Sequence, residues 1–170
     1  MNSNKNLVLI GMMGSGKSVI GSLLSETLKL EFKDVDKIIE KETGYKISEI
    51  FKNEGESYFR KLEEKITLKL LKLENIIVSL GGGGFINKNI RTQVLKNHLS
   101  FWLNWKDTTL INRIKKSRKR PIAFNSNENE IKKIILDRSK IYRMANFKIN
   151  CENLSKNQIV NEIKEIYEKN

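Results

Sequence analysis

The stretch LVLIGMMGSGKS, residues 7–18, decides the fold. Its first four residues are apolar and predict a buried strand, and the apolar spacing that follows predicts a helix over residues 17–30. Between the two, residues 11–18 fit the pattern G-x-x-x-x-G-K-[ST]. Glycines let successive backbone N–H groups point into one concavity, and the start of a helix adds partial positive charge. The stretch therefore predicts a loop that holds phosphate.

Two side chains of this loop carry specific expectations. Lys17 is expected to reach the β- and γ-phosphates of a nucleoside triphosphate, because a lysine at this position of such a loop acts as a positive point charge. Ser18 is expected to hold Mg²⁺ through its hydroxyl. The motif therefore indicates a nucleoside triphosphate, and it does not say which molecule receives the phosphate.

The rest of the chain alternates short apolar runs with amphipathic stretches. Strands are predicted over 6–10, 31–34, 76–80, 100–103 and 147–150. Helices are predicted over 17–30, 37–42, 47–51, 60–73, 88–96, 107–116, 131–144 and 154–169, the last with Ser155 as its N-cap. This alternation predicts an α/β sandwich with a parallel sheet, and ligands of such sheets bind beyond the carboxyl ends of the strands. One proline and no linker composition predict a single domain over 1–170.

Composition narrows the classes of partner. The net charge of +12, from 32 basic and 20 acidic residues, favours an anionic partner or a solvated basic surface. The single cysteine, Cys151, allows no internal disulfide, which suits a reducing cytosol, so we expect a cytoplasmic protein. The single histidine, His98, excludes a His/Cys metal cluster and a Ser-His-Asp triad. Because the sequence has no 18-residue apolar run, we expect no membrane partner.

Two carboxylates follow the second predicted strand, in FKDVDKIIE. We expect Asp34 and Asp36 to point to one face of an extended chain. A phosphate loop also needs an acidic partner for Mg²⁺ at the end of another strand, and the strand over 76–80 ends without one. Asp34 is the candidate for that partner, which leaves Asp36 to accept a proton from an acceptor hydroxyl. The alternative is an exposed aspartate pair in a turn.

Glycines and basic residues supply the remaining candidates. Residues 81–84 are four glycines after a buried strand, where backbone can approach a ligand closely, although a plain turn has the same composition. Arg60 precedes Glu63 by three positions on a predicted helix and can pair with it. Residues 113–120 read RIKKSRKR. This basic segment is interpreted as a nucleic-acid patch, a lid that supplies an arginine to the transferred phosphoryl group, or a solvated loop.

Taken in order, these stretches resemble the shikimate kinase family. The resemblance rests on GMMGSGKS, DVDKIIE, GESYFRKLE, SLGGGG, RKRPI and DRSKIY, and it runs from the first strand to about residue 150. It implies a P-loop kinase fold, a three-layer α/β sandwich with a five-stranded parallel sheet, substrate-binding helices (about 34–62) and a lid (about 113–125). It implies that ATP, with one Mg²⁺, phosphorylates the 3-hydroxyl of shikimate, a step toward chorismate and the aromatic amino acids.

The resemblance also implies a role for each matching residue. Catalytic roles fall on Lys17, on Asp36 as the base, and on Arg120 as the lid arginine that reaches the phosphates. The nucleotide would be contacted by Gly14, Ser15, Gly16, Lys17, Ser18, Val19, Arg120 and Arg113, the last stacked on adenine. Mg²⁺ would be held by Ser18 and, through water, by Asp34. Shikimate would be held by Asp36, Arg60, Glu63, Gly81, Gly82, Gly83 and Arg138, with Glu63 orienting Arg60.

Two stretches depart from the pattern of the family. The lid reads RPIA where R-P-L-L is commoner, and near Arg138 the chain has Lys140 in place of proline and Arg143 in place of an acidic residue. Two other functions stay open: another small-molecule kinase of this fold, such as a gluconate-type kinase, and a nucleotide-dependent protein that binds nucleic acid. Of the three functions, we expect phosphorylation of shikimate. The expected partners are ATP and shikimate, with no nucleic acid, and the protein is expected to be a monomer.

Overall fold

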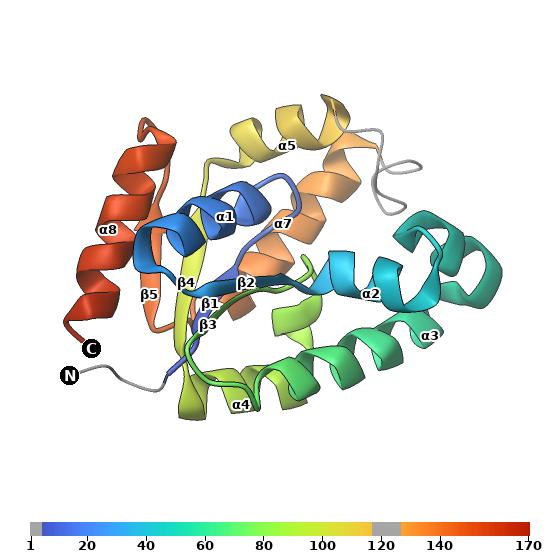
Figure 1. Cartoon of the computed structure of the whole chain (residues 1–170). Coiled ribbons are helices and arrows are strands. Elements are labelled where there is room, and N and C mark those ends of the chain that lie inside the picture. Colours follow the sequence, from blue (N-terminus) through green and yellow to red (C-terminus); the bar gives the residue numbers. More distant parts are fainter. Residues whose placement is uncertain (1–4, 117–126) are drawn as a thin grey trace.

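The computed structural model describes residues 5–116 and 127–170 and forms a sandwich around one sheet (Figure 1). The sheet has five parallel strands in the order β2-β3-β1-β4-β5. The strands are β1 (Leu7–Ile10), β2 (Glu31–Asp34), β3 (Ile76–Ser79), β4 (Leu99–Asn104) and β5 (Phe147–Asn150). The predicted α/β class with a five-stranded parallel sheet is confirmed.

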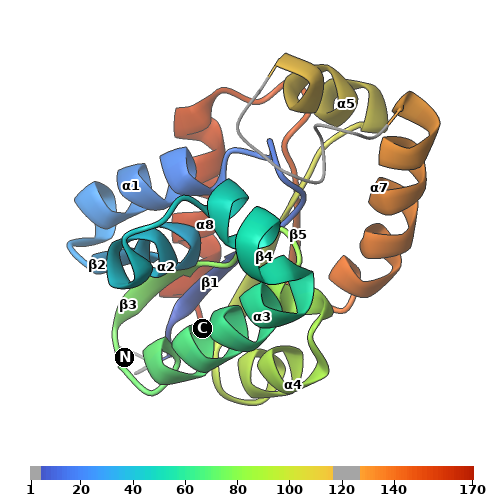
Figure 2. The same ribbon diagram turned by 90° about the vertical axis from the view of Figure 1, so that its right-hand side faces the viewer.

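Helices cover both faces of this sheet (Figures 1 and 2). The described helices are α1 (Lys17–Leu28), α2 (Val35–Thr43), α3 (Ile47–Leu70), α4 (Lys88–Asn97), α5 (Asp107–Lys116), α7 (Glu128–Tyr142) and α8 (Lys156–Glu168), with a 3-10 turn η1 (Gly84–Ile86). Helices α1 and α8 lie together on one face, and α3, α4 and α7 lie on the other. None of the helices in the described part is long and apolar enough to span a membrane.

Successive side chains of the central strand, β1, alternate between the two halves of the hydrophobic core. Leu7 and Leu9 belong to the cluster under α1 and α8, whereas Val8 and Ile10 belong to the cluster under α3, α4 and α7. All four side chains are at most 1% exposed. A parallel strand covered by helices on both faces reads as a continuous apolar run, and this is why the sequence LVLI has no polar position.

Asn6, directly before β1, joins the amino ends of the three central strands. Its side-chain amide donates to the carbonyl of Leu73 at 2.7 Å, and its side-chain oxygen accepts from the backbone N–H of Ile76 at 3.1 Å. Its own carbonyl accepts from the N–H of Leu99 at 3.0 Å. A fully buried amide with all these partners fixes where β3 and β4 begin beside β1.

Two helical expectations need correction. The two helices expected over 47–51 and 60–73 are present within α3 and are separated by a break at Gly55, but they extend almost to that break, and the second ends at Leu70. Gly55 has φ 81° and ψ 170°, a backbone conformation that lies outside the helical region and suits glycine. The second helix also begins earlier than expected, at Val35, because Asp34 caps it: its carboxylate accepts from the N–H of Lys37 at 3.4 Å.

The topology places the phosphate loop at the switch point of the sheet. From β1 the chain passes first to β2 and β3 on one side, and later to β4 and β5 on the other. Ligands of open α/β sheets bind at such a point, beyond the carboxyl ends of the strands. The loops after β1, β2, β3 and β4 therefore meet at one edge. Most of the expected lid, including Arg120, lies outside the described residues.

Candidate active site

The phosphate loop has the backbone of an anion cradle. Gly14 and Gly16 have φ of 79° and 89°, which a glycine adopts without strain, and the N–H of Ser15 donates back to the carbonyl of Met12 at 3.1 Å. Helix α1 begins at Lys17 with no side-chain cap and no acidic residue in its first turn. Its first N–H groups therefore point at whatever lies over the loop, together with the positive end of the helix dipole.

Lys17 lies across this loop and is 6% exposed. Its ammonium group donates to the carbonyls of Gly11 at 2.8 Å and Met12 at 3.0 Å. A buried ammonium held by carbonyls at the mouth of an anion cradle is a positive charge already in place for a phosphate. That Lys17 reaches the β- and γ-phosphates of a nucleotide stays a prediction.

Ser18 and Asp34 form the expected pair beside the loop. The Ser18 hydroxyl donates to the Asp34 carboxylate at 2.5 Å, and Asp34 is 9% exposed at the end of β2. Asp36 lies in the first turn of α2, so the expectation that both aspartates extend from one stretch of strand is wrong. The Asp36 carboxylate lies beside Gly81, the first glycine after β3, whereas the Asp34 carboxylate accepts from Ser18.

The glycine run is a floor on which charged side chains from other elements lie. A Cβ at Gly81 would be 2.3 Å from Glu63 Oε1 and 2.8 Å from Asp36 Oδ1. A Cβ at Gly83 would be 2.5 Å from Arg60 Nη1. These distances are shorter than real Cβ contacts, so a side chain at either position would displace the charged ends of Glu63, Asp36 or Arg60.

Gly82, within the same glycine run, lies close to the phosphate loop and to α7. A Cβ at Gly82 would be 3.2 Å from the backbone nitrogen of Met13 and 3.4 Å from Arg138 Nη1. Arg138 Nη1 also donates to the Gly82 carbonyl at 3.0 Å. The glycine run therefore lies directly beside the phosphate loop. The structure brings Arg138 to the site in spite of the departures around it in sequence.

Arg60 and Glu63 form a partly buried ion pair on α3. Arg60 Nη1 donates to Glu63 Oε2 at 2.6 Å, and Arg60 Nε and Nη2 donate to Glu56 at 3.2 and 3.1 Å. Burial lowers the pKa of Arg60, but the two carboxylates outweigh that effect and raise it. The guanidinium is therefore a permanent cation whose orientation is fixed by two acids.

Glu63 itself is 2% exposed, and its second oxygen, Oε1, has no hydrogen-bond partner. Burial raises the pKa of this carboxyl, opposed by Arg60, while the nearby Asp36 raises it further. An unpartnered buried carboxylate oxygen costs free energy unless a ligand supplies a donor. Glu63 Oε1 therefore points to a ligand with a hydroxyl above Gly81.

Tyr142 supports the floor from below. Its hydroxyl donates to the same Gly82 carbonyl that Arg138 contacts, and its ring packs against Trp102 with centroids 6.0 Å apart. Burial raises the pKa of Tyr142 to about 12, partly offset by Arg138, so the phenol keeps its proton as a donor at neutral pH. Tyr142 was not expected at the site from the sequence. Its position four residues after Arg138 on a helix, which places both side chains on one face, could have indicated it.

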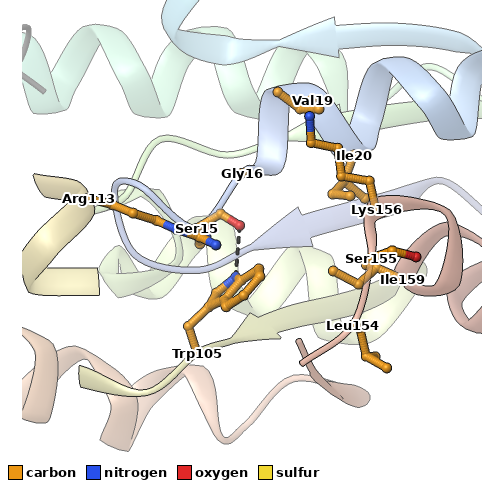
Figure 3. Close-up of a pocket in the computed structure, with 10 residues that line it drawn as sticks. All are labelled: Ser15, Gly16, Val19, Ile20, Trp105, Arg113, Leu154, Ser155, Lys156 and Ile159. Carbon is orange, nitrogen blue, oxygen red and sulfur yellow. Dashed lines mark hydrogen bonds between the residues drawn. The ribbon is translucent and has the colours of Figure 1, made fainter. Parts of the chain in front are cut away.

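A pocket of about 440 Å³ opens on the other side of the phosphate loop (Figure 3). Its lining is Ser15, Gly16, Val19, Ile20, Trp105, Arg113, Leu154, Ser155, Lys156 and Ile159. The expected nucleotide residues Ser15, Gly16, Val19 and Arg113 therefore share one cavity. The sequence did not identify Trp105 or the residues from Leu154 to Ile159, although Trp105 follows the carboxyl end of β4, the edge where ligands of such sheets bind.

Comparisons with known proteins agree with this geometry. The family model described as shikimate kinase matches residues 13–168. A shikimate kinase of Sulfurihydrogenibium is 42% identical over 159 residues, which covers 94% of this chain and 95% of that protein. A shikimate kinase of Persephonella marina is 44% identical, with 94% and 96% covered.

Solved structures show the same relationship. The shikimate kinase from Acinetobacter baumannii in complex with shikimate has a TM-score of 0.93 and 26% identity, with 99% of this chain and 95% of that chain covered. A gluconokinase from Sinorhizobium meliloti has a TM-score of 0.56 at 13% identity, with 99% and 97% covered, which shows a shared fold alone. The chain belongs to the shikimate kinase family.

Proposed function

We propose that this protein transfers the γ-phosphoryl group of ATP to the 3-hydroxyl of shikimate. One observation carries the proposal: two guanidinium groups and two carboxylates meet over the glycine floor, which itself touches the phosphate loop at Met13. Shikimate offers one carboxylate and three hydroxyls. Arginines bind carboxylates in paired hydrogen bonds, and carboxylates accept from hydroxyls, so the two sets are complementary.

On the acceptor side, Arg60 and Arg138 bind the shikimate carboxylate, and Asp36 accepts from a ring hydroxyl and takes its proton. Glu63 orients Arg60 through the 2.6 Å ion pair and offers its unpartnered oxygen to a second hydroxyl. The glycines 81–83 let the substrate ring lie close to the backbone. Phosphoryl transfer needs positioning and charge stabilisation more than a protein nucleophile, so the absence of histidine from this set is no obstacle.

On the nucleotide side, the N–H groups of the loop from Gly14 to Ser18 and the ammonium of Lys17 bind the phosphates. Ser18 and Asp34 fit one Mg²⁺, because Mg²⁺ in kinases is bound by one or two protein oxygens together with substrate phosphates. When bound, this ion neutralises charge on the β- and γ-phosphates. Val19 and Arg113 contact the nucleoside in the adjoining pocket. Arg120, outside the described residues, remains the predicted lid arginine.

We further propose that the protein acts as a cytoplasmic monomer on small molecules, within a single domain whose substrate-binding region spans about 34–62 and whose lid spans about 113–125. The two alternative functions are less well supported. A gluconate-type kinase would also use an arginine and an aspartate, and the match of the shikimate kinase family model over residues 13–168 is what favours shikimate. Binding to nucleic acid does not require that floor at all.

The test is ADP formation with ATP and Mg²⁺, measured with shikimate, quinate, gluconate or no acceptor. We expect turnover with shikimate alone. ATP hydrolysis that ignores shikimate would leave the phosphate loop correctly assigned and the acceptor site wrongly assigned. Turnover with gluconate would favour the second small-molecule kinase.

A variant separates the roles of base and binder. Asp36→Asn keeps the shape of the side chain and removes its basicity, so kcat should fall by roughly 10²–10⁴. Asp137→Asn is a matched control that should leave kcat in place, because Asp137 is exposed on α7 and its ion pair is with Lys140. If Asp36→Asn raised only the KM for shikimate, Asp36 would be a binding residue and not the base.

A further inference from the structure

Trp105 is the residue that connects the two walls of the nucleotide pocket. Its indole N–H donates to the carbonyl of Ser15 in the phosphate loop at 2.9 Å, the dashed line in Figure 3. The Arg113 guanidinium lies over its ring, with Cζ 3.8 Å from the ring centroid. Arg113 Nη1 also reaches the Gly14 carbonyl at 3.4 Å. Helix α5 and the phosphate loop are therefore joined through one indole.

We propose that Trp105 is a positioning residue for nucleotide binding, which holds the Arg113 guanidinium flat so that its other face can stack on the base. This inference rests on the proposed use of ATP and adds a residue to it. A guanidinium has two flat faces, and the indole covers one of them. The apolar side chains of Val19, Leu154 and Ile159 line the same pocket, which suits a flat heterocycle between them and Arg113.

Within residues 5–116 and 127–170, the stack on Trp105 is the main contact that fixes the Arg113 side chain. Arg113 lies in the last turn of α5, is half-buried, and its polar contact with Gly14 is long for a hydrogen bond. An arginine has several rotatable bonds, so ordering it only when the nucleotide arrives would reduce affinity. The Trp105 indole fixes the Arg113 side chain before the nucleotide binds.

The opposite end of α5 is also fixed to this pocket. Glu152, in the loop that leads to Leu154, accepts from the N–H of Lys106 at 3.2 Å and from the hydroxyl of Thr109 at 3.0 Å. The start of α5 is therefore held by the loop that forms the far wall. With this support, the position of Arg113 depends mainly on the residue beneath its guanidinium, which is Trp105.

The experiment measures the affinity of ADP and of inorganic pyrophosphate for the whole chain by calorimetry. Trp105→Leu removes the ring, and we expect ADP to bind about 3- to 30-fold more weakly, the range of a cation–π contact converted to affinity. Pyrophosphate, which has no base, should bind within about twofold of the original protein. Trp105→Phe keeps a ring and should lose less. The double variant Trp105→Leu/Arg113→Ala should bind ADP no more weakly than Arg113→Ala alone.

Trp102→Phe is the matched control, because Trp102 is the other tryptophan of the chain and packs on Tyr142 away from this pocket. It should leave both affinities in place. An equal loss for ADP and pyrophosphate in Trp105→Leu would mean that Trp105 acts through the Ser15 carbonyl, and additive losses in the double variant would mean that it acts independently of Arg113. Either result overturns the inference. Normal ADP binding without shikimate-dependent turnover would instead overturn the proposed function.

Discussion

Replacing Gly83 by alanine should weaken shikimate binding and leave the fold intact. The new Cβ would be 2.5 Å from Arg60 Nη1 and 2.7 Å from Arg60 Cζ, against about 3.4 Å for an ordinary contact. The backbone at Gly83 has φ −106°, which alanine adopts freely. The guanidinium is the far end of a flexible side chain, so it gives way by about 1 Å and the protein still folds.

That displacement has a cost at the ion pair. Arg60 Nη1 is 2.6 Å from Glu63 Oε2, and a shift of about 1 Å takes it out of hydrogen-bond range. The displaced guanidinium also leaves the position in which we propose that it binds the shikimate carboxylate, and a hydrogen bond between charged groups contributes about 1.5–3 kcal/mol. The KM for shikimate should therefore rise roughly 10- to 150-fold. The KM for ATP should stay within about twofold, because the phosphate loop does not contact Arg60.

Steady-state kinetics with each substrate varied in turn checks this result, and Gly84→Ala is the matched control. A Cβ at Gly84 would meet Leu80 Cβ at 3.4 Å and Glu63 Oε1 at 3.5 Å, which are ordinary contacts. An unchanged KM for shikimate in Gly83→Ala would refute the placement of Arg60 beside the substrate. An equal rise in Gly84→Ala would mean that the loop is sensitive to any side chain.

Three further predictions concern stability and reactivity. A Cβ at Gly21 in α1 would be 2.2 Å from the Phe32 ring, so Gly21→Ala should lower the free energy of unfolding by about 1–3 kcal/mol. Adding Phe32→Leu to this variant should restore part of that loss. Additive losses in a denaturant titration would contradict the contact. Burial lowers the pKa of His98 in the folded protein below 6.5. As the pH falls below that value, His98 is protonated first in the unfolded chain, and the folded protein therefore loses stability. His98→Asn should flatten the loss of melting temperature between about pH 7.5 and pH 5.5, and an unchanged slope would refute it. Burial raises the pKa of Cys151 to about 12, so a thiol reagent at pH 8 should label the protein only after unfolding, and rapid labelling of the folded protein would contradict its burial.

The sheet and the phosphate loop could be predicted from sequence because their signals are local. The run LVLI, the glycines and the Lys-Ser pair each specify a backbone state within a few residues, and the structure has the strand, loop and helix at those positions. The family was identified for the same reason, since its motifs are short and ordered along the chain. The comparisons confirm that identification.

The convergence of the acceptor side could not be derived from spacing alone. Asp36 was predicted to extend from β2 because the alternation of side chains along a strand was continued past Asp34. Asp34 instead caps a helix that begins one residue later. The two helices of α3 were predicted as separate, but the sequence did not show that they meet at a break of one residue, Gly55, because a single positive-φ glycine leaves the apolar pattern on both sides intact. Arg138 reaches Gly82 from a helix more than fifty residues away, and only the packing of α7 on η1 decides that contact.

The order of the strands has a consequence for how the chain folds as it is made. Of the five described strands, β1 is synthesised first and is the central one, and its neighbours β3 and β4 are made much later. Asn6 pairs with Ile76, 70 residues on, and with His98, 92 residues on. Contacts of such long separation slow folding and leave apolar strand edges unpaired in the meantime. A nascent chain that stops before Leu99 holds an apolar strand with one open edge, and the hydrogen bond from Trp105 to the Ser15 carbonyl of the phosphate loop forms only after more than half of these residues have been synthesised.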